Sequence, residues 1–138
     1  MAEQQIVIFK LDGVEYGIDI LQVNEIVKLQ AITKMPNMPD YVDGVINLRG
    51  KVIPIVDLKV KFKLNPGARN ENTRIIVVNV DHKVLGAVVD EVSEVLRIKE
   101  SQIEDANTIS THINEQFVRG VAKVEDRLVI LLKIDEIF

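Results

Sequence analysis

The sequence predicts an all-β protein made of two small five-stranded β-barrels that share one hydrophobic core. Three observations predict this fold class. Short segments rich in Ile and Val are separated by Gly, Asp and Asn turns, helical periodicity is nearly absent, and the second half of the chain repeats the pattern of the first. A hydrophobic fraction of 47 % with 28 % charged residues is typical of a soluble globular domain.

The predicted strands follow one another along the chain with little between them. In order, they are "QQIVIFKL", "VEYGIDI", "GVINL", "KVIPIV", "TRIIVVNV", "VLGAVV" and "RLVILLKI". Each is short and rich in β-branched residues, as strands are. We expect only short helical turns, near 20–22, near 39–42 where a proline suits a first helical position, at "KESQIEDA" and at the final "IDEIF".

The two halves of the chain can be aligned without a gap over long stretches. A shift of 69 residues (75 − 6) places the segment that begins at Ile6 on the segment that begins at Ile75. A shift of 76 (120 − 44) aligns "DYVDGVINLRGKVIPIVDL" with "QFVRGVAKVEDRLVILLKI". Such similarity implies one supersecondary unit used twice. We expect the first barrel over about 10–72, completed by an N-terminal or C-terminal strand, and the second over 73–138.

Each unit is expected to curl into a barrel, because a flat five-stranded sheet would leave its edges open to aggregation. The predicted linker is "KFKLNPGARNENT", in which a Pro-Gly pair breaks regular structure and the charged residues favour solvent.

Charge and composition exclude several classes of partner. Seventeen Lys and Arg against 21 Asp and Glu give a formal charge of −4, the wrong sign for binding that depends on phosphate neutralisation. Aromatic residues at 4 %, with no Trp, leave little for base stacking. The sequence has no apolar run of membrane-spanning length, no secretory signal at Met1 and no cysteine. We therefore expect a cytoplasmic protein that binds no nucleic acid and inserts in no membrane.

The sequence shows no recognisable catalytic or metal-binding pattern. His82 and His112 lie in separate loops without a cysteine or a spaced partner for zinc, and no serine sits in a nucleophile-elbow pattern. Single scattered glycines form no phosphate-binding loop. Two carboxylates can still meet in space to form a glycosidase-type pair, but nothing favours this. We expect a binding protein, without cofactor or metal, and not an enzyme.

The stretch "GVINLRGKVIPIVDL" reads as two apolar strands joined by a polar turn. The matching turn of the second half has Lys123-Val124-Glu125-Asp126 in place of Asn47-Leu48-Arg49-Gly50, so the barrel does not require Asn47 or Arg49. Gly50 suits a tight turn, whereas Arg is the residue type enriched at interface hot spots. Glu25 recurs as Glu94, and it either pairs with Arg49 or is an ordinary solvated strand residue.

Three segments of the chain carry a specific pattern: "YGIDILQVNEIVK", "PDYVDGVINLRGKVIPIVDL" and "GAVVDEVSEVL". They resemble the CheW family, the adaptor of bacterial chemotaxis, and the likeness runs from about Gln5 to Phe138. The resemblance implies a single CheW-like domain over 1–138, with two SH3-like five-stranded barrels around a shared core. It also implies a non-catalytic scaffold that holds the regulatory domain of the histidine kinase CheA to the cytoplasmic tips of methyl-accepting chemoreceptors, recruited to membrane-associated arrays.

The resemblance further implies which residues bind each partner. For the receptor they are Val23, Ile26, Gly44, Asn47, Arg49, Val92 and Val95. For the kinase, or for coupling to it, they are Glu25, Arg49 and Gly50. The apolar members are expected to line a groove between the barrels, and the competing interpretation for each is barrel core.

Two other functions remain as alternatives. The chain could be a CheW-like regulatory domain of a larger signalling protein, although the initial Met1 and the compact ending after "IDEIF" argue against a fragment. It could also be an SH3-like barrel that binds RNA, a class that the pI of about 5.2 disfavours.

Overall fold

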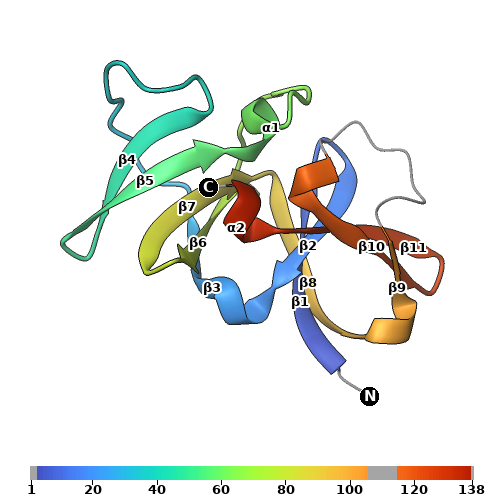
Figure 1. Cartoon of the computed structure of the whole chain (residues 1–138). Helices are drawn as coiled ribbons and strands as arrows, with labels where there is room; N and C mark the ends of the chain where they lie inside the picture. The colour runs from blue at the N-terminus through green and yellow to red at the C-terminus, as the bar shows by residue number, and fades with distance from the viewer. Residues whose placement is uncertain (1–2, 106–114, 138) are drawn as a thin grey trace.

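The computed structural model describes residues 3–105 and 115–137, and most of these residues lie in two β-sheets (Figure 1). The six-stranded sheet has the order β8 (Glu91–Lys99), β1 (Glu3–Leu11), β2 (Val14–Asp19), β11 (Arg127–Leu132), β10 (Val118–Val124), β9 (Ile103–Asp105). The five-stranded sheet has the order β3 (Val23–Lys28), β6 (Arg74–Val80), β7 (Lys83–Val89), β5 (Lys51–Asp57), β4 (Val42–Leu48). The predicted all-β class is confirmed.

Short helices occur at the strand connections. Three of them match predictions: η1 (Ile20–Gln22), η2 (Glu100–Gln102) and α2 (Ile134–Ile137). The segment 39–42 forms only a turn, in which the Val42 N–H donates to the Pro39 carbonyl at 3.0 Å. Two helices were not predicted, α1 (Leu58–Lys61) and η4 (Glu115–Phe117). They are too short to show helical periodicity in a sequence.

Each sheet contains strands from both halves of the chain. Strand β1 of the first repeat pairs with β8 of the second, and β2 pairs with β11. In the other sheet, β6 and β7 of the second repeat pair with β3 and β5 of the first. The parallel pairs β2–β11 and β5–β7 join the repeats at matching positions, where Gly17 faces Leu131 and Gly86 faces Ile55. The expected division into 10–72 and 73–138 is therefore wrong as a description of the sheets. The repeats exchange strands instead of forming one barrel each.

Both sheets curl into barrels. In each sheet, the chain that follows one edge strand, β3 or β8, reaches the strand at the opposite edge of the same sheet. In the six-stranded sheet, η2 connects the edge strands β8 and β9, so this chain segment pairs with β1 on one side and β10 on the other. In the five-stranded sheet, a single residue, Thr33, exchanges two backbone hydrogen bonds of 2.9 Å with Val45 of β4. We refer to the two units as the six-stranded and the five-stranded barrel.

A glycine permits this closure in each barrel. A Cβ added at Gly44 would lie 2.1 Å from the Thr33 carbonyl oxygen, and one added at the matching Gly120 would lie 2.5 Å from the Glu104 carbonyl oxygen. No side chain fits at either distance. Both glycines also mark a register shift in their hairpin, so the repeats share a β-bulge at the same position.

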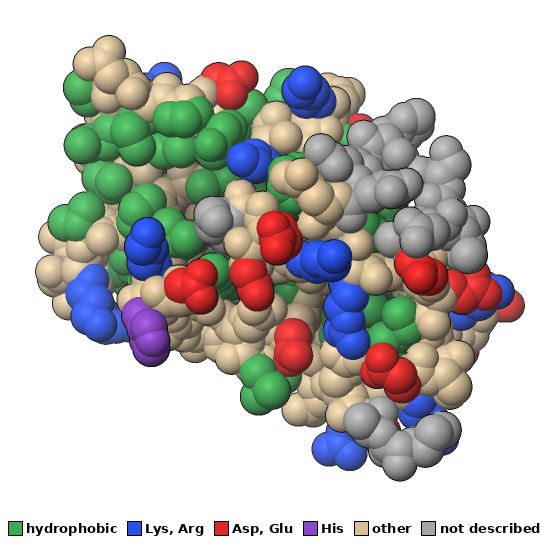
Figure 2. Space-filling view, viewed as in Figure 1, with side chains coloured by type: hydrophobic (Ala, Val, Ile, Leu, Met, Phe, Trp, Pro, Cys, Tyr) green, Lys and Arg blue, Asp and Glu red, His purple; other side chains and the backbone are tan. Residues whose placement is uncertain are grey.

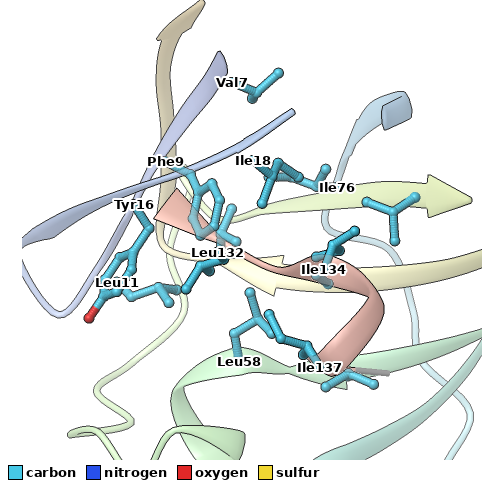
Figure 3. Close-up of a cluster of buried hydrophobic side chains, with 14 of the residues drawn as sticks. Val7, Phe9, Leu11, Tyr16, Ile18, Leu58, Ile76, Leu132, Ile134 and Ile137 are labelled. Atoms are coloured by element: carbon cyan, nitrogen blue, oxygen red, sulfur yellow. The ribbon is translucent and has the colours of Figure 1, made fainter. Parts of the chain in front are cut away.

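A central hydrophobic cluster joins the two barrels, as predicted. Figure 3 shows this cluster, in which Phe9 and Ile18 from one sheet face Ile76 from the other. Helices α1 and α2 contribute Leu58, Ile134 and Ile137, and α2 lies between the sheets in Figure 1. Separate clusters fill each barrel interior. Fully burying one such aliphatic side chain contributes about 1.5–3 kcal/mol, so the cluster holds the barrels together.

The linker between the repeats is fixed to the five-stranded barrel by Arg69. Its guanidinium Nη2 lies 2.6 Å from Asp43 Oδ2 and donates to Asp57 Oδ2 at 2.9 Å. Partial burial acts to lower the pKa of Arg69, but the hydrogen bonds to Asp57 and Asp43 outweigh it and raise the pKa. Asp57 also caps α1, since its Oδ1 accepts from the Lys59 N–H at 3.0 Å. The linker is therefore anchored, not free.

Candidate functional site

The β4–β5 hairpin ends in a tight turn whose backbone depends on local side chains. Arg49 and Gly50 have φ of 51° and 84°, the left-handed pair that a type I′ hairpin turn requires. The Gly50 N–H donates to Asn47 Oδ1 at 2.9 Å. Asn47 and Gly50 thus have structural roles in the turn, while both remain exposed.

The turn places Arg49 beside Glu25 of β3. Arg49 Nη2 and Glu25 Oε2 form a hydrogen-bonded ion pair, so the pairing left open by the sequence is confirmed. The side chain of Arg49 is 68 % exposed and that of Glu25 is 30 % exposed. Such an exposed pair contributes only about 0.2–1 kcal/mol to stability. Its exposed position is consistent with a role in recognition.

The ion pair lies on the rim of a cleft of 240 Å³, which we call the open barrel end. Leu48, Ile53 and Val77 form its floor, and these residues belong to the interior cluster of the five-stranded barrel. The remaining lining residues are Asn24, Glu25, Arg49, Lys51 and Val84. The cleft is therefore the end of the barrel interior, with apolar walls and a charged rim.

The six-stranded barrel has a different arrangement at the matching end. Arg127 donates to Glu15 Oε1 from Nε at 3.0 Å and to Oε2 from Nη2 at 2.7 Å, and Nη2 also lies 3.0 Å from Glu94 Oε2. The hydrogen bond from Arg127 holds the pKa of Glu15 below its ordinary value, and Glu15 in turn raises the pKa of Arg127. Both recurring glutamates, Glu25 and Glu94, thus meet an arginine of a hairpin, but the two arginines occupy different positions.

The four predicted apolar site residues form two pairs related by the repeat. Val23 and Val92 are half-buried and pack against the central cluster, so core packing accounts for part of each side chain. Ile26 and Val95 are 39 % and 45 % exposed. The exposed pair lies on β3 and β8, which are edge strands of the two sheets.

Gly44 differs from the other predicted contact residues because it is buried. Its φ is 146°, and the Thr33 backbone covers the space where a side chain would lie. Any effect of Gly44 on binding is therefore expected to act through the shape of the hairpin.

An exposed apolar patch on β4, β5 and the preceding loop was not predicted. Figure 2 shows apolar side chains gathered over β4 and β5. Val52 is 70 % exposed, and Met35 and Met38 are each 48 % exposed. Strand alternation could have indicated Val52, because it pairs with the exposed Asn47 on the outer face.

The described residues provide no group of three or more His, Cys, Asp or Glu side chains that could hold a metal ion. His82 is exposed in the β6–β7 turn, and His112 lies outside the described residues. Within 3–105 and 115–137, no helix has the length and apolar character that a membrane crossing requires. The candidate site is thus a charged and apolar surface around an open barrel end.

Comparisons with known proteins agree with this geometry. Residues 5–138 match the CheW-like domain family. The chain is 40 % identical over 134 residues to the chemotaxis protein CheW of Klebsiella aerogenes, covering 97 % of this chain and 81 % of that one. It is 39 % identical to the chemotaxis protein CheW of Helicobacter pylori, covering 96 % and 80 %. The crystal structure of the scaffolding protein TtCheW from Thermoanaerobacter tengcongensis superposes with a TM-score of 0.92 at 40 % identity, over 100 % of this chain and 89 % of that one. The chain therefore belongs to the CheW family.

Proposed function

We propose that this chain is a non-catalytic chemotaxis adaptor that holds the histidine kinase CheA against the cytoplasmic tips of chemoreceptors. The family match and the relatives named as chemotaxis and scaffolding proteins support the general role. The exposed Arg49–Glu25 pair is the observation that carries the docking proposal, because a charged pair that adds little to stability is best placed to orient a partner. The adaptor acts in the cytoplasm and is recruited to receptor arrays.

The receptor-binding surface that we propose runs along β3 and β8. Its members are Val23, Ile26, Val92 and Val95, together with the hairpin residues Gly44, Asn47 and Arg49. The exposed Ile26 and Val95 supply apolar anchors of the kind that a helical hairpin needs, and Arg49 supplies a polar rim. Val23 and Val92 are half-buried, so only part of each side chain is available to contact the receptor.

The kinase-binding surface that we propose lies on the β4–β5 hairpin. Arg49 and Gly50 lie at its tip beside Glu25 of β3, and the exposed Val52, Met35 and Met38 extend it. Methionine side chains adapt to a partner surface at low cost. The family resemblance implies the same two-barrel fold in the kinase regulatory domain, so we propose that one of its barrels packs on this surface.

Scaffolding requires both surfaces to be occupied at once. Interfaces of ordinary size bury about 1,600 Å² in total, and their affinity depends on a few residues more than on area. Within an array, each contact raises the effective concentration for the next, so modest individual affinities suffice.

The proposal is tested by binding each purified partner to isotope-labelled protein. We expect the CheA regulatory domain to shift the amide resonances of Val52, Met35 and Met38, and a receptor cytoplasmic fragment to shift those of β3 and β8. Arg49, which belongs to both proposed surfaces, should respond to each partner. Failure of both partners to bind would reject the proposed function.

A further inference from the structure

The two barrel ends are built from matching positions but are closed differently. The repeat shift of 69 matches Glu15 with Val84 and Glu94 with Glu25, and the shift of 76 matches Arg127 with Lys51. In the six-stranded barrel these positions hold an arginine between two carboxylates. The chain therefore supplies its own closing side chain at one end.

The open barrel end lacks this arrangement of an arginine between two carboxylates. Val84 replaces one carboxylate, and Arg49 already pairs with the other, Glu25. Lys51 lines the cleft, and none of the ion pairs among the described residues includes it. A cleft of 240 Å³ remains above the apolar floor.

We propose that the open barrel end receives one apolar side chain of the receptor tip, and that a carboxylate of the same receptor segment pairs with Lys51. This inference rests on the proposed function and specifies the chemistry of its receptor contact. The apolar floor of Leu48, Ile53 and Val77 favours an apolar inserted side chain. The carboxylate follows from charge, because Arg49 and Lys51 outnumber Glu25 on the rim.

Continuity with the proposed receptor surface favours the receptor over the kinase as the occupant. Asn24 and Glu25 line the cleft and lie on β3, between Val23 and Ile26 of that surface. One helical segment along β3 can therefore reach the cleft and the exposed apolar residues together.

The test introduces the charged residues that close the six-stranded barrel at the matching positions of the five-stranded barrel. The double variant Val84→Glu/Lys51→Arg recreates the two carboxylates and the arginine of the closed end. We expect it to fold and to bind a receptor cytoplasmic fragment at least tenfold more weakly than the unmodified protein does. The matched control is Glu15→Val/Arg127→Lys, which opens the other end and should leave receptor affinity unchanged.

Methyl resonances provide an independent measurement on the unmodified protein. Saturating receptor fragment should shift the methyl signals of Leu48, Ile53, Val77 and Val84. The inference is overturned if these signals stay fixed while the fragment binds, if the double variant binds normally, or if only the kinase domain shifts them; in each case the adaptor function stands. If neither partner binds the unmodified protein, the proposed function fails and the inference fails with it.

Discussion

Arg49 adopts a left-handed backbone conformation in the β4–β5 turn, and its guanidinium pairs with Glu25 on β3. The turn and the strand belong to opposite edges of the five-stranded sheet. The pair therefore spans the end of the barrel, where both side chains are accessible to a partner. The ion pair thus places the polar turn of the sequence on the proposed docking surface.

Reversing the charge of Arg49 should impair coupling without unfolding the protein. Arg49→Glu places two carboxylates on the rim of the open barrel end, and we expect a loss of about 0.2–1 kcal/mol in unfolding free energy. Receptor-dependent CheA autophosphorylation in a reconstituted mixture should fall at least fivefold. Urea unfolding followed by circular dichroism checks that the barrels remain.

The charge-swapped variant Glu25→Arg/Arg49→Glu is the control for this prediction. It restores an ion pair but reverses the orientation of the charges that a partner meets. If the pair acts only within the chain, the swap recovers full coupling. Our account expects stability to recover while coupling stays impaired, and normal coupling by both variants would remove Arg49 from the interface.

Substitution of Gly44 should destabilise the fold far more than substitution of Gly50. In Gly44→Ala, the new Cβ would lie 2.1 Å from the Thr33 carbonyl, which must move. We expect a cost of about 3 kcal/mol or more, since backbone strain of about 1–3 kcal/mol adds to the clash. Chemical denaturation of the two variants provides the comparison.

Gly50→Ala serves as the matched variant, because its added Cβ meets nothing within 4 Å. Its cost should be about 1–2 kcal/mol, from the left-handed backbone alone. Equal losses for the two variants would show that the closure at Thr33 is not a tight contact.

Acid should weaken the closed end of the six-stranded barrel. The hydrogen bond from Arg127 lowers the pKa of Glu15, so this carboxylate contributes stability at pH values above its ordinary pKa of 4.5. The contribution is lost as the pH falls through the lowered pKa. The gap in urea midpoint between the parent and Glu15→Gln should therefore be larger at pH 7 than at pH 3. A gap independent of pH would contradict this assignment.

The exchange of strands predicts that neither half of the chain folds alone. Peptides covering 1–66 and 67–138 each lack strands of both sheets, because β1 and β2 pair with the second half while β6 and β7 pair with the first. We expect each peptide to be unfolded by circular dichroism and the mixture to regain a dispersed amide spectrum. A folded isolated half would contradict the exchanged topology.

Most of the fold could be predicted from the sequence, but the exchange of strands between the two repeats could not. Turn residues and Ile/Val runs mark the strands, and the repeat shifts matched Gly44 with Gly120 before both were found at barrel closures. The alignment could not show which repeat supplies each neighbour, because two exchanged barrels have the same local pattern as two consecutive ones. The pairs between the repeats decide between them: the antiparallel pairs β1–β8 and β3–β6 and the parallel pairs β2–β11 and β5–β7.

The candidate site could be predicted only in part, because it combines residues from strands that are far apart in the sequence. The motif around Arg49 and the recurrence of Glu25 gave the ion pair as one of two interpretations, and the structure contains it. The open barrel end was missed because Lys51, Val77 and Val84 come from three different strands, and each is an ordinary strand residue in the sequence. Comparing Val84 with Glu15 across the repeat was the available signal.

The most direct test of the adaptor account is a three-component binding measurement. Labelled protein is titrated with the CheA regulatory domain, and a receptor cytoplasmic fragment is then added to the saturated complex, with sedimentation used to determine the mass. Our account predicts a ternary complex in which the kinase domain shifts the resonances of Val52, Met35 and Met38, the receptor fragment shifts those of β3 and β8, and Arg49 between the two surfaces responds to both. Displacement of one partner by the other from a shared surface would contradict it.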